Sequence, residues 1–190
     1  MTTLLLTRHG ETDWNAQHRW QGQSDPPLNE RGREQARALA AELDGFDVVY
    51  ASDLARARET AEIVAQGREV RVDERLRERR FGRWEGLTRD EIGNRFADEL
   101  ARWRSGDGPG AADAEPFDAF AARVGAFLQD VVSRHPDETV LIVAHGGTIR
   151  AIHAEAAGLD YVRDHRSIPS VANCSVSRYA LRDGKFARLD

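Results

Sequence analysis

The chain has 190 residues, enough for one domain with a sizeable hydrophobic core. Its 41% hydrophobic and 31% charged residues are typical of a soluble globular protein, and its net charge of -5 argues against nucleic acid or an anionic membrane as partner. The single cysteine, Cys174, excludes an internal disulfide framework and is compatible with the cytoplasm, where we expect the protein. We see neither a signal peptide nor an apolar run of membrane-spanning length, and expect no membrane partner.

The first predicted element is a buried strand over Leu4-Leu5-Leu6, a short apolar run that leads into Arg8, His9 and a glycine. An imidazole beside a guanidinium suits attack on a phosphoryl group. Neutral histidine is a nitrogen nucleophile, and the planar fork of arginine matches phosphate oxygens. For Arg8 and His9 alone, however, a structural role at a strand end is the better interpretation.

A second strand is predicted over Val48 to Ala51, followed by a helix for which Ser52 or Asp53 is the predicted N-cap. Arg56 then falls in the first turn of that helix. A helix N-terminus favours anions through its free amides and dipole, and a guanidinium there adds a full charge. The alternative is a solvated helix face, which is the better interpretation for Arg58.

A third strand is predicted over Thr139 to Ala144, and it ends in His145 and Gly146-Gly147 before another helix. The glycines allow a ligand to approach the backbone closely. In open α/β sheets, ligands bind at the carboxyl ends of the strands. Because three strands each end near a basic or imidazole side chain, a convergent phosphate pocket becomes the better hypothesis.

Strand and helix patterns alternate along the chain. This alternation predicts an α/β fold, a three-layer α/β/α sandwich with a mostly parallel central sheet, in a single domain over residues 1–190. The other predicted elements are a polar loop over 10–28, a helix from Asn29 to a C-cap at Gly45, a strand over 70–72, a charged irregular segment over 73–87, a polar helix over about 88–104, a surface loop over 105–113, a helix through 117–131 and a strand within 173–179.

Several motifs are absent from the sequence. It has no P-loop, no Cys-x-x-Cys pair and no His-Glu-x-x-His, so we expect neither P-loop nucleotide hydrolysis nor a metal site. Arginines alternate with aromatic residues over 73–87, but the acidic residues among them argue against a nucleic-acid surface. Cys174 is predicted to be a small core residue. The remaining histidines, His18, His135, His153 and His165, lack ligand spacing and are expected to be structural or exposed.

Taken together, these residues resemble the histidine phosphatase superfamily, in its phosphoglycerate-mutase-like branch. The matching motifs follow in family order over about residues 4–178. They are the segments 6–15, 19–22, 25–32, 51–61, 76–78, 82–88 and 143–147.

The resemblance implies a role for each matching residue. His9 would be the nucleophile that becomes phosphohistidine, and Glu78 the proton donor, for which Glu11 and Glu85 are less favoured candidates. The resemblance implies that Arg8, Arg56, His145 and Asn15 contact phosphoryl oxygens, and that Gln21 and Gly22 line the substrate side. Gly146, where a ligand can approach the backbone closely, is a further expected binding position. Two guanidiniums can neutralise the charge of a phosphoryl group without a metal, and no cofactor is expected.

Hydrolysis is the expected outcome of this chemistry. Mutase members of the family are longer and carry a C-terminal tail that shields the phosphoenzyme, whereas this chain ends at Asp190, and an open site lets water take the phosphoryl group. The motif Gly82 to Thr88 also resembles the phosphatase members. By contrast, the segment Ala112 to Pro116 departs from the Gly-Gly-Glu-Ser of many relatives, which leaves the substrate preference open.

The expected substrate is a small phosphomonoester such as phosphoglycerate, its glycosylated forms, a sugar phosphate or a cobalamin-pathway phosphate. Two alternatives stay open. The first is a cofactor-dependent phosphoglycerate mutase. The second is a catalytically silent module that binds phospho-ligands, which is disfavoured because every expected catalytic position is filled. The resemblance also allows a homodimer, although no apolar stripe in the sequence requires one.

Overall fold

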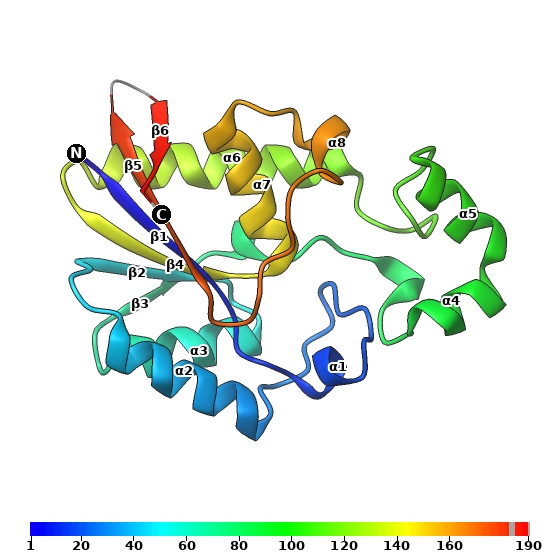
Figure 1. The fold of residues 1–190 in the computed structure, drawn as a ribbon, viewed down its shortest axis with the longest axis horizontal. Helices are drawn as coiled ribbons and strands as arrows, with labels where there is room; N and C mark the ends of the chain where they lie inside the picture. Colours follow the sequence, from blue (N-terminus) through cyan, green and yellow to red (C-terminus); the bar gives the residue numbers. More distant parts are fainter. Residues whose placement is uncertain (183–184, 190) are drawn as a thin grey trace.

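One mixed sheet organises the chain in the computed structural model, which describes residues 1–182 and 185–189 (Figure 1). The sheet strands found there are β1 (Thr3–Arg8), β2 (Val48–Ala51), β3 (Val70–Val72), β4 (Thr139–Ala144), β5 (Val176–Arg182) and β6 (Lys185–Arg188), in the spatial order β3-β2-β4-β1-β5-β6. The first four strands run parallel. β5 pairs antiparallel with β1, and β6 pairs antiparallel with β5. The prediction of a mostly parallel sheet is confirmed.

Helices cover both faces of this sheet (Figure 1). α2 (Glu30–Glu42) and α3 (Ala55–Ala65) lie on one face, whereas α6 (Phe117–Arg134), α7 (Gly146–Ala157) and the short α8 (Tyr161–Asp164) lie on the other. This arrangement confirms the predicted three-layer sandwich. The remaining helical segments are α1 (Asp13–Ala16), η1 (Glu74–Leu76), η2 (Gly82–Trp84), α4 (Arg89–Arg95) and α5 (Ala97–Ser105).

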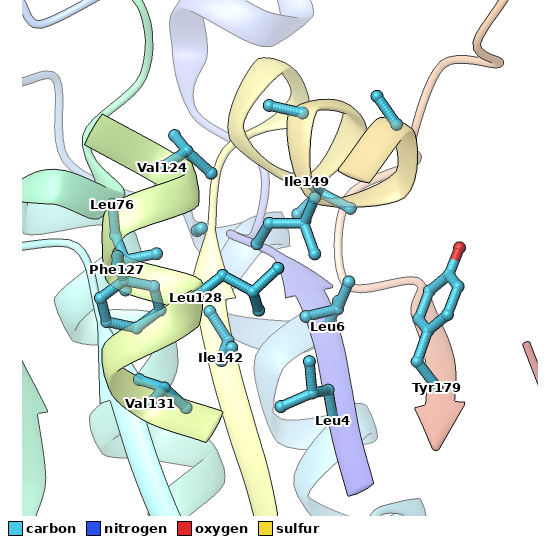
Figure 2. Packing of buried hydrophobic residues seen from close by; sticks show 14 of the residues in the cluster. Leu4, Leu6, Leu76, Val124, Phe127, Leu128, Val131, Ile142, Ile149 and Tyr179 are labelled. Carbon is cyan, nitrogen blue, oxygen red and sulfur yellow. The ribbon is translucent and has the colours of Figure 1, made fainter. Parts of the chain in front are cut away.

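The alternation of side chains along β1 supplies a hydrophobic core on each face of the sheet. Leu4 and Leu6 point toward α6, where they belong to one buried cluster with Phe127 and Leu128 (Figure 2). Leu5 points the other way and joins the cluster beneath α2 and α3. Each such fully buried side chain contributes roughly 1.5–3 kcal/mol to folding. Because helices cover both faces of the sheet, side chains on both faces of the central parallel strands β1 and β4 are buried, and these strands are continuous apolar runs.

The parallel register brings three strand ends together. Arg8 at the end of β1 pairs with Ala144 at the end of β4, and Ala51 at the end of β2 pairs with Val143. The residues that follow these strands therefore begin at the same edge of the sheet. None of the helices within the described residues combines the length and apolarity needed to cross a lipid bilayer.

The single polar helix predicted over 88–104 is wrong, because the structure has two helices there. α4 ends at Arg95 and α5 begins at Ala97, and the two point in different directions (Figure 1). Phe96 between them leaves the helical region, with φ -138° and ψ 46°. Its ring packs against a third buried cluster that includes Trp84 and Leu100. Tertiary packing of Phe96 therefore overrides the helical propensity of the segment.

The prediction of a surface loop over residues 105–113 is only partly right, because the same cluster includes part of this segment. Within that range, Gly110 and Ala111 are buried, and Ala111 belongs to the cluster with Trp84. The carbonyl oxygen of Pro109 accepts a hydrogen bond from Arg79 at 2.8 Å. This stretch is therefore partly an interior segment.

Two predicted helix caps are also wrong. α2 starts as predicted at the Asn29 N-cap, but its C-cap is Leu43, and Gly45 lies beyond it. The N-cap of α3 is Leu54 and has no capping side chain of its own. Instead, Asp25 accepts a hydrogen bond from the Ala55 amide at 2.7 Å, so a distant loop caps this helix.

The predicted capping residues of α3 have other partners. Asp53 forms an ion pair with Arg77, and the Ser52 hydroxyl accepts a hydrogen bond from the Leu54 amide at 3.3 Å.

The strand predicted within residues 173–179 is β5, and it begins only at Val176. Cys174 precedes it in a left-handed turn (φ 53°), in which its amide donates to the Arg8 carbonyl at 2.9 Å, and its side chain is only partly buried.

Candidate active site

His9 follows β1 directly and is almost fully buried, with 2% of its surface exposed. Its amide donates to the Ala144 carbonyl at 3.0 Å, and its carbonyl accepts from Asn173 at 2.7 Å. The ring nitrogen Nδ1 lies 2.6 Å from the Gly10 carbonyl oxygen, which can only accept. Nδ1 therefore carries the hydrogen, and Nε2 keeps a free lone pair.

The charge state of His9 suits a nucleophile. Burial, followed by the neighbouring charges of Arg56 and Arg8, holds the pKa of His9 well below its usual range. The imidazole is consequently neutral near pH 7, with Nε2 able to form a new bond.

Arg56, in the first turn of α3, is 1% exposed. Its two terminal nitrogens donate to the carbonyl oxygens of Gly22 and Ser24, each at 2.7 Å. Its Nε is buried and has no hydrogen-bond partner among the described residues. Burial lowers the pKa of Arg56 to about 10, so the guanidinium remains charged at neutral pH. Two carbonyls thus fix the guanidinium while its Nε–H has no acceptor among the described residues.

Arg8 is arranged in the same way. One terminal nitrogen donates to the Val171 carbonyl at 2.7 Å, whereas its buried Nε lacks a partner in the described part of the chain. Burial lowers the pKa of Arg8, and the carboxylate of Glu78 acts in the opposite direction.

His145 is the N-cap residue of α7 and is fully buried. Its ring centroid lies 5.2 Å from that of His9. Both ring nitrogens are buried and unpartnered within the residues described. Burial, then the charge of Arg56, holds the pKa of His145 well below its usual range, so this ring is also neutral near pH 7.

The unpartnered nitrogens of these side chains define an anion site. Buried polar groups in proteins are normally hydrogen-bonded, and leaving one unpaired costs roughly 1–3 kcal/mol. Here the Nε atoms of Arg8 and Arg56 and the ring of His145 are all buried without partners near His9. A phosphoryl group, with several acceptor oxygens and negative charge, would satisfy them together.

Glu78 belongs to the segment that follows η1, and its carboxylate lies beside this site at the first turn of α7. Its Oε2 accepts from the Gly147 amide at 2.8 Å, and its Oε1 accepts from the Arg79 amide at 2.9 Å. Glu78, Arg8 and Gly146 line one cavity of about 240 Å³. The Glu78 carboxyl group therefore faces the same space as the Arg8 guanidinium.

The other predicted site residues lie around this centre. The Asn15 oxygen accepts from the Thr12 amide at 3.2 Å in a capping box, which leaves its NH₂ group to donate elsewhere. Gln21 is buried and its side-chain oxygen is unpartnered among the described residues. Gly22 adopts φ +54° and turns its carbonyl toward Arg56. A Cβ at Gly146 would lie 3.7 Å from the Arg8 Nε, so this residue packs against that guanidinium.

Two features of the site were not found from the sequence. Glu85 accepts hydrogen bonds from the loop that holds Arg56, and aromatic side chains line the cavity beside Glu78. Glu85 lies in the motif Gly82 to Thr88, which is recognisable in the sequence. The aromatic lining, by contrast, comes from residues far apart in the chain. Within the described residues, no group of three or more His, Cys, Asp or Glu side chains could hold a metal ion.

The comparisons with known proteins concern almost the whole chain. The sequence model described as histidine phosphatase superfamily (branch 1) matches residues 4–189. Phosphoserine phosphatase 1 of Hydrogenobacter thermophilus is 35% identical over 167 residues, which cover 84% of this chain and 78% of that protein. Phosphoglycerate mutase-like protein 4 of Arabidopsis thaliana is 36% identical over 191 residues, covering 95% and 80% of the two chains.

A solved structure agrees with these sequence matches. The crystal structure of phosphoserine phosphatase from Entamoeba histolytica, in complex with 3-phosphoglyceric acid, superposes with a TM-score of 0.88 at 28% identity. The match covers 100% of this chain and 96% of that one. The fold of this chain is therefore that of a known phosphatase.

Proposed function

The chain belongs to branch 1 of the histidine phosphatase superfamily, and we propose that it hydrolyses small phosphomonoesters through a phosphohistidine formed on His9. Membership of this family and its named phosphatase relatives make the chain a phosphoric monoester hydrolase, as the sequence predicted. We further propose that residues 1–190 constitute a single domain of this family.

In the proposed complex, the phosphoryl oxygens accept hydrogen bonds from the Nε atoms of Arg8 and Arg56 and from the ring of His145. The single observation that carries the proposal is that these buried nitrogens lack partners among the described residues while a neutral imidazole lies beside them. The Asn15 NH₂ group adds a donor. Fixed donors around a developing charge need no reorganisation during the reaction.

In the first step, His9 Nε2 attacks phosphorus in line with the ester oxygen, so that a P–N bond forms as the P–O ester bond breaks. The departing oxygen takes a proton from the carboxylic acid form of Glu78, which releases the alcohol. In the second step, the Glu78 carboxylate takes a proton from water as the water oxygen attacks phosphorus. The P–N bond then breaks, and inorganic phosphate and neutral His9 are produced.

The test measures phosphate release from p-nitrophenyl phosphate and 3-phosphoglycerate, with excess EDTA, for the wild type and His9→Ala. We expect EDTA-resistant release by the wild type that disappears in the variant. The matched control is His153→Ala, a histidine on α7 whose ring packs against Tyr179. Equal release by the wild type and His9→Ala would contradict the phosphohistidine route.

A phosphoglycerate mutase is the second candidate, because several relatives are named probable phosphoglycerate mutases or mutase-like proteins. The same reaction mixtures distinguish it. A mutase would convert 3-phosphoglycerate to 2-phosphoglycerate in the presence of a bisphosphoglycerate primer and release little phosphate. Phosphate binding without turnover of either ester would indicate a silent binding module instead.

A further inference from the structure

We propose that the substrate of this enzyme carries a planar aromatic group on its alcohol part, bound in the cavity beside Glu78. This inference depends on the proposed phosphatase function. The cavity of about 240 Å³ is lined on the side of the reaction by Arg8, Glu78 and Gly146. The rest of its lining includes the rings of Trp20, Phe81, Trp103, Phe117 and Tyr161, and we call this space the aromatic cavity.

Three of these rings form a preorganised group. The ring centroid of Trp20 lies 4.7 Å from that of Phe81 and 5.3 Å from that of Trp103, with the rings nearly perpendicular. The fully buried Trp84 anchors the group, 5.5 Å from Trp20. Trp20, Phe81 and Trp103 are each only partly buried, so ring surface remains available to a ligand.

A second group of rings lines the cavity from α6 and α8. Phe117 stacks on His165 with centroids 4.2 Å apart, and Tyr161 lies 5.7 Å from His165. Arg79 joins the two groups, because its guanidinium lies 4.1 Å from the Phe117 centroid and 5.0 Å from that of Phe81. Contacts with Arg79 therefore link the two groups of rings into one continuous lining.

Besides Arg8, two arginines line the cavity, and both already donate to main-chain carbonyls. The terminal nitrogens of Arg79 donate to the Glu115 and Pro109 carbonyls, at 2.7 and 2.8 Å. Arg150 donates to the carbonyls of Ile168 and His165. These carbonyls partly satisfy both guanidiniums and fix their orientation, so neither is free to turn toward a substrate carboxylate such as that of phosphoserine or 3-phosphoglycerate.

An aromatic group needs none of these donors. Aromatic rings favour stacked or edge-to-face contact with other rings, and covering their exposed surface stabilises the complex. A cavity of roughly 150 Å³ can hold benzene, so about 240 Å³ accommodates one or two fused rings. The ring lining and the engaged cations together favour an aromatic substrate over a carboxylated one.

The experiment compares benzyl phosphate with O-phosphoserine. Both release a primary alcohol, so the difference in kcat/KM reports on the group beside the leaving oxygen. We expect the wild type to prefer benzyl phosphate. We expect Trp103→Ala, and independently Phe117→Ala, to reduce the ratio of the two kcat/KM values about tenfold. The ratio does not depend on the fraction of enzyme that is folded.

Phe96→Ala is the matched control. Phe96 packs against the same third cluster as Trp103 but does not line the aromatic cavity, so the ratio should stay at its wild-type value. A wild-type preference for O-phosphoserine, or equal losses for both substrates in Trp103→Ala, would overturn the inference. His9-dependent hydrolysis would leave the proposed function intact in that case. Absence of His9-dependent hydrolysis of either ester would contradict the proposed function itself.

Discussion

At the scale of single residues, two hydrogen bonds hold the Glu78 carboxylate in the position from which, in the proposed mechanism, it delivers a proton. Both oxygens accept from main-chain amides, of Gly147 and Arg79, so the group cannot turn away from the cavity without losing them. General acid catalysis depends on such a fixed position and contributes roughly 10²–10⁴-fold.

We therefore predict that Glu78→Gln slows hydrolysis according to the leaving group. Glutamine retains the size of the side chain but cannot protonate a departing alkoxide. For O-phosphoserine we expect kcat/KM, which reports only on the steps up to release of the alcohol, to fall by roughly 10²–10⁴-fold. For p-nitrophenyl phosphate kcat/KM should fall much less, because nitrophenolate leaves without a proton. Steady-state kinetics with both esters measures the difference. Glu74→Gln, at an exposed carboxylate nearby, is the control, and equal losses of kcat/KM for the two esters in Glu78→Gln would contradict the assignment.

The sequence located the residues of the anion site because each follows a recognisable strand. Arg8, His9, Arg56 and His145 do come together, while their catalytic roles stay predictions. The lining of the aromatic cavity could not be found in this way. Trp20 and Trp103 contact each other across more than eighty positions, and no local pattern encodes that contact.

At the scale of elements, the loop over residues 21–24 determines how Arg56 is held. The carboxylate of Glu85 fixes this loop. Its Oε1 accepts from the amides of Gln23 and Phe81, at 3.1 and 2.9 Å. Its Oε2 accepts from the amide and hydroxyl of Ser24, at 2.8 and 2.6 Å. Glu85 thus positions the carbonyls that hold the Arg56 guanidinium.

We predict that Glu85→Gln weakens the binding of inorganic phosphate about tenfold, because an amide cannot accept all four bonds and the loop that orients Arg56 loosens. Inhibition by inorganic phosphate measures the change, and thermal unfolding measures stability. The control is Glu91→Gln, since Glu91 also accepts a main-chain bond, from Thr88, but lies on α4. A positioning role requires a larger change in phosphate affinity for Glu85→Gln than for Glu91→Gln at similar loss of Tm. Unchanged phosphate inhibition would rule it out.

Element types were more predictable than element ends. The apolar runs of β1, β2 and β4 and the stripe of α6 carry enough local signal to identify strands and a helix. By contrast, Asp25 caps α3 from thirty residues away, and Phe96 breaks a polar helix by packing inward. Both outcomes depend on tertiary contacts, which periodicity does not contain.

At the scale of the whole molecule, the anion site lowers stability in acid. His9 and His145 are buried and neutral, and each has a pKa well below its usual value of about 6.5. As the pH falls below about 6.5, the unfolded chain binds a proton at each histidine, but the folded chain does not until its much lower pKa is reached. The unfolded state then holds more protons, so the free energy of unfolding decreases with falling pH.

We predict that each histidine contributes a loss of roughly 1.4 kcal/mol per pH unit below about pH 6. His9→Gln replaces one of the two groups with a side chain that does not titrate, so the pH dependence of its unfolding free energy should be shallower by one proton. Urea denaturation of both proteins between about pH 5 and pH 7 measures the two slopes, in a buffer without phosphate, because bound phosphate would itself stabilise the folded state. Carboxylates titrate in both proteins and cancel in the difference. Identical slopes would mean that folded His9 is protonated as readily as in the unfolded chain, contrary to its burial between two guanidiniums.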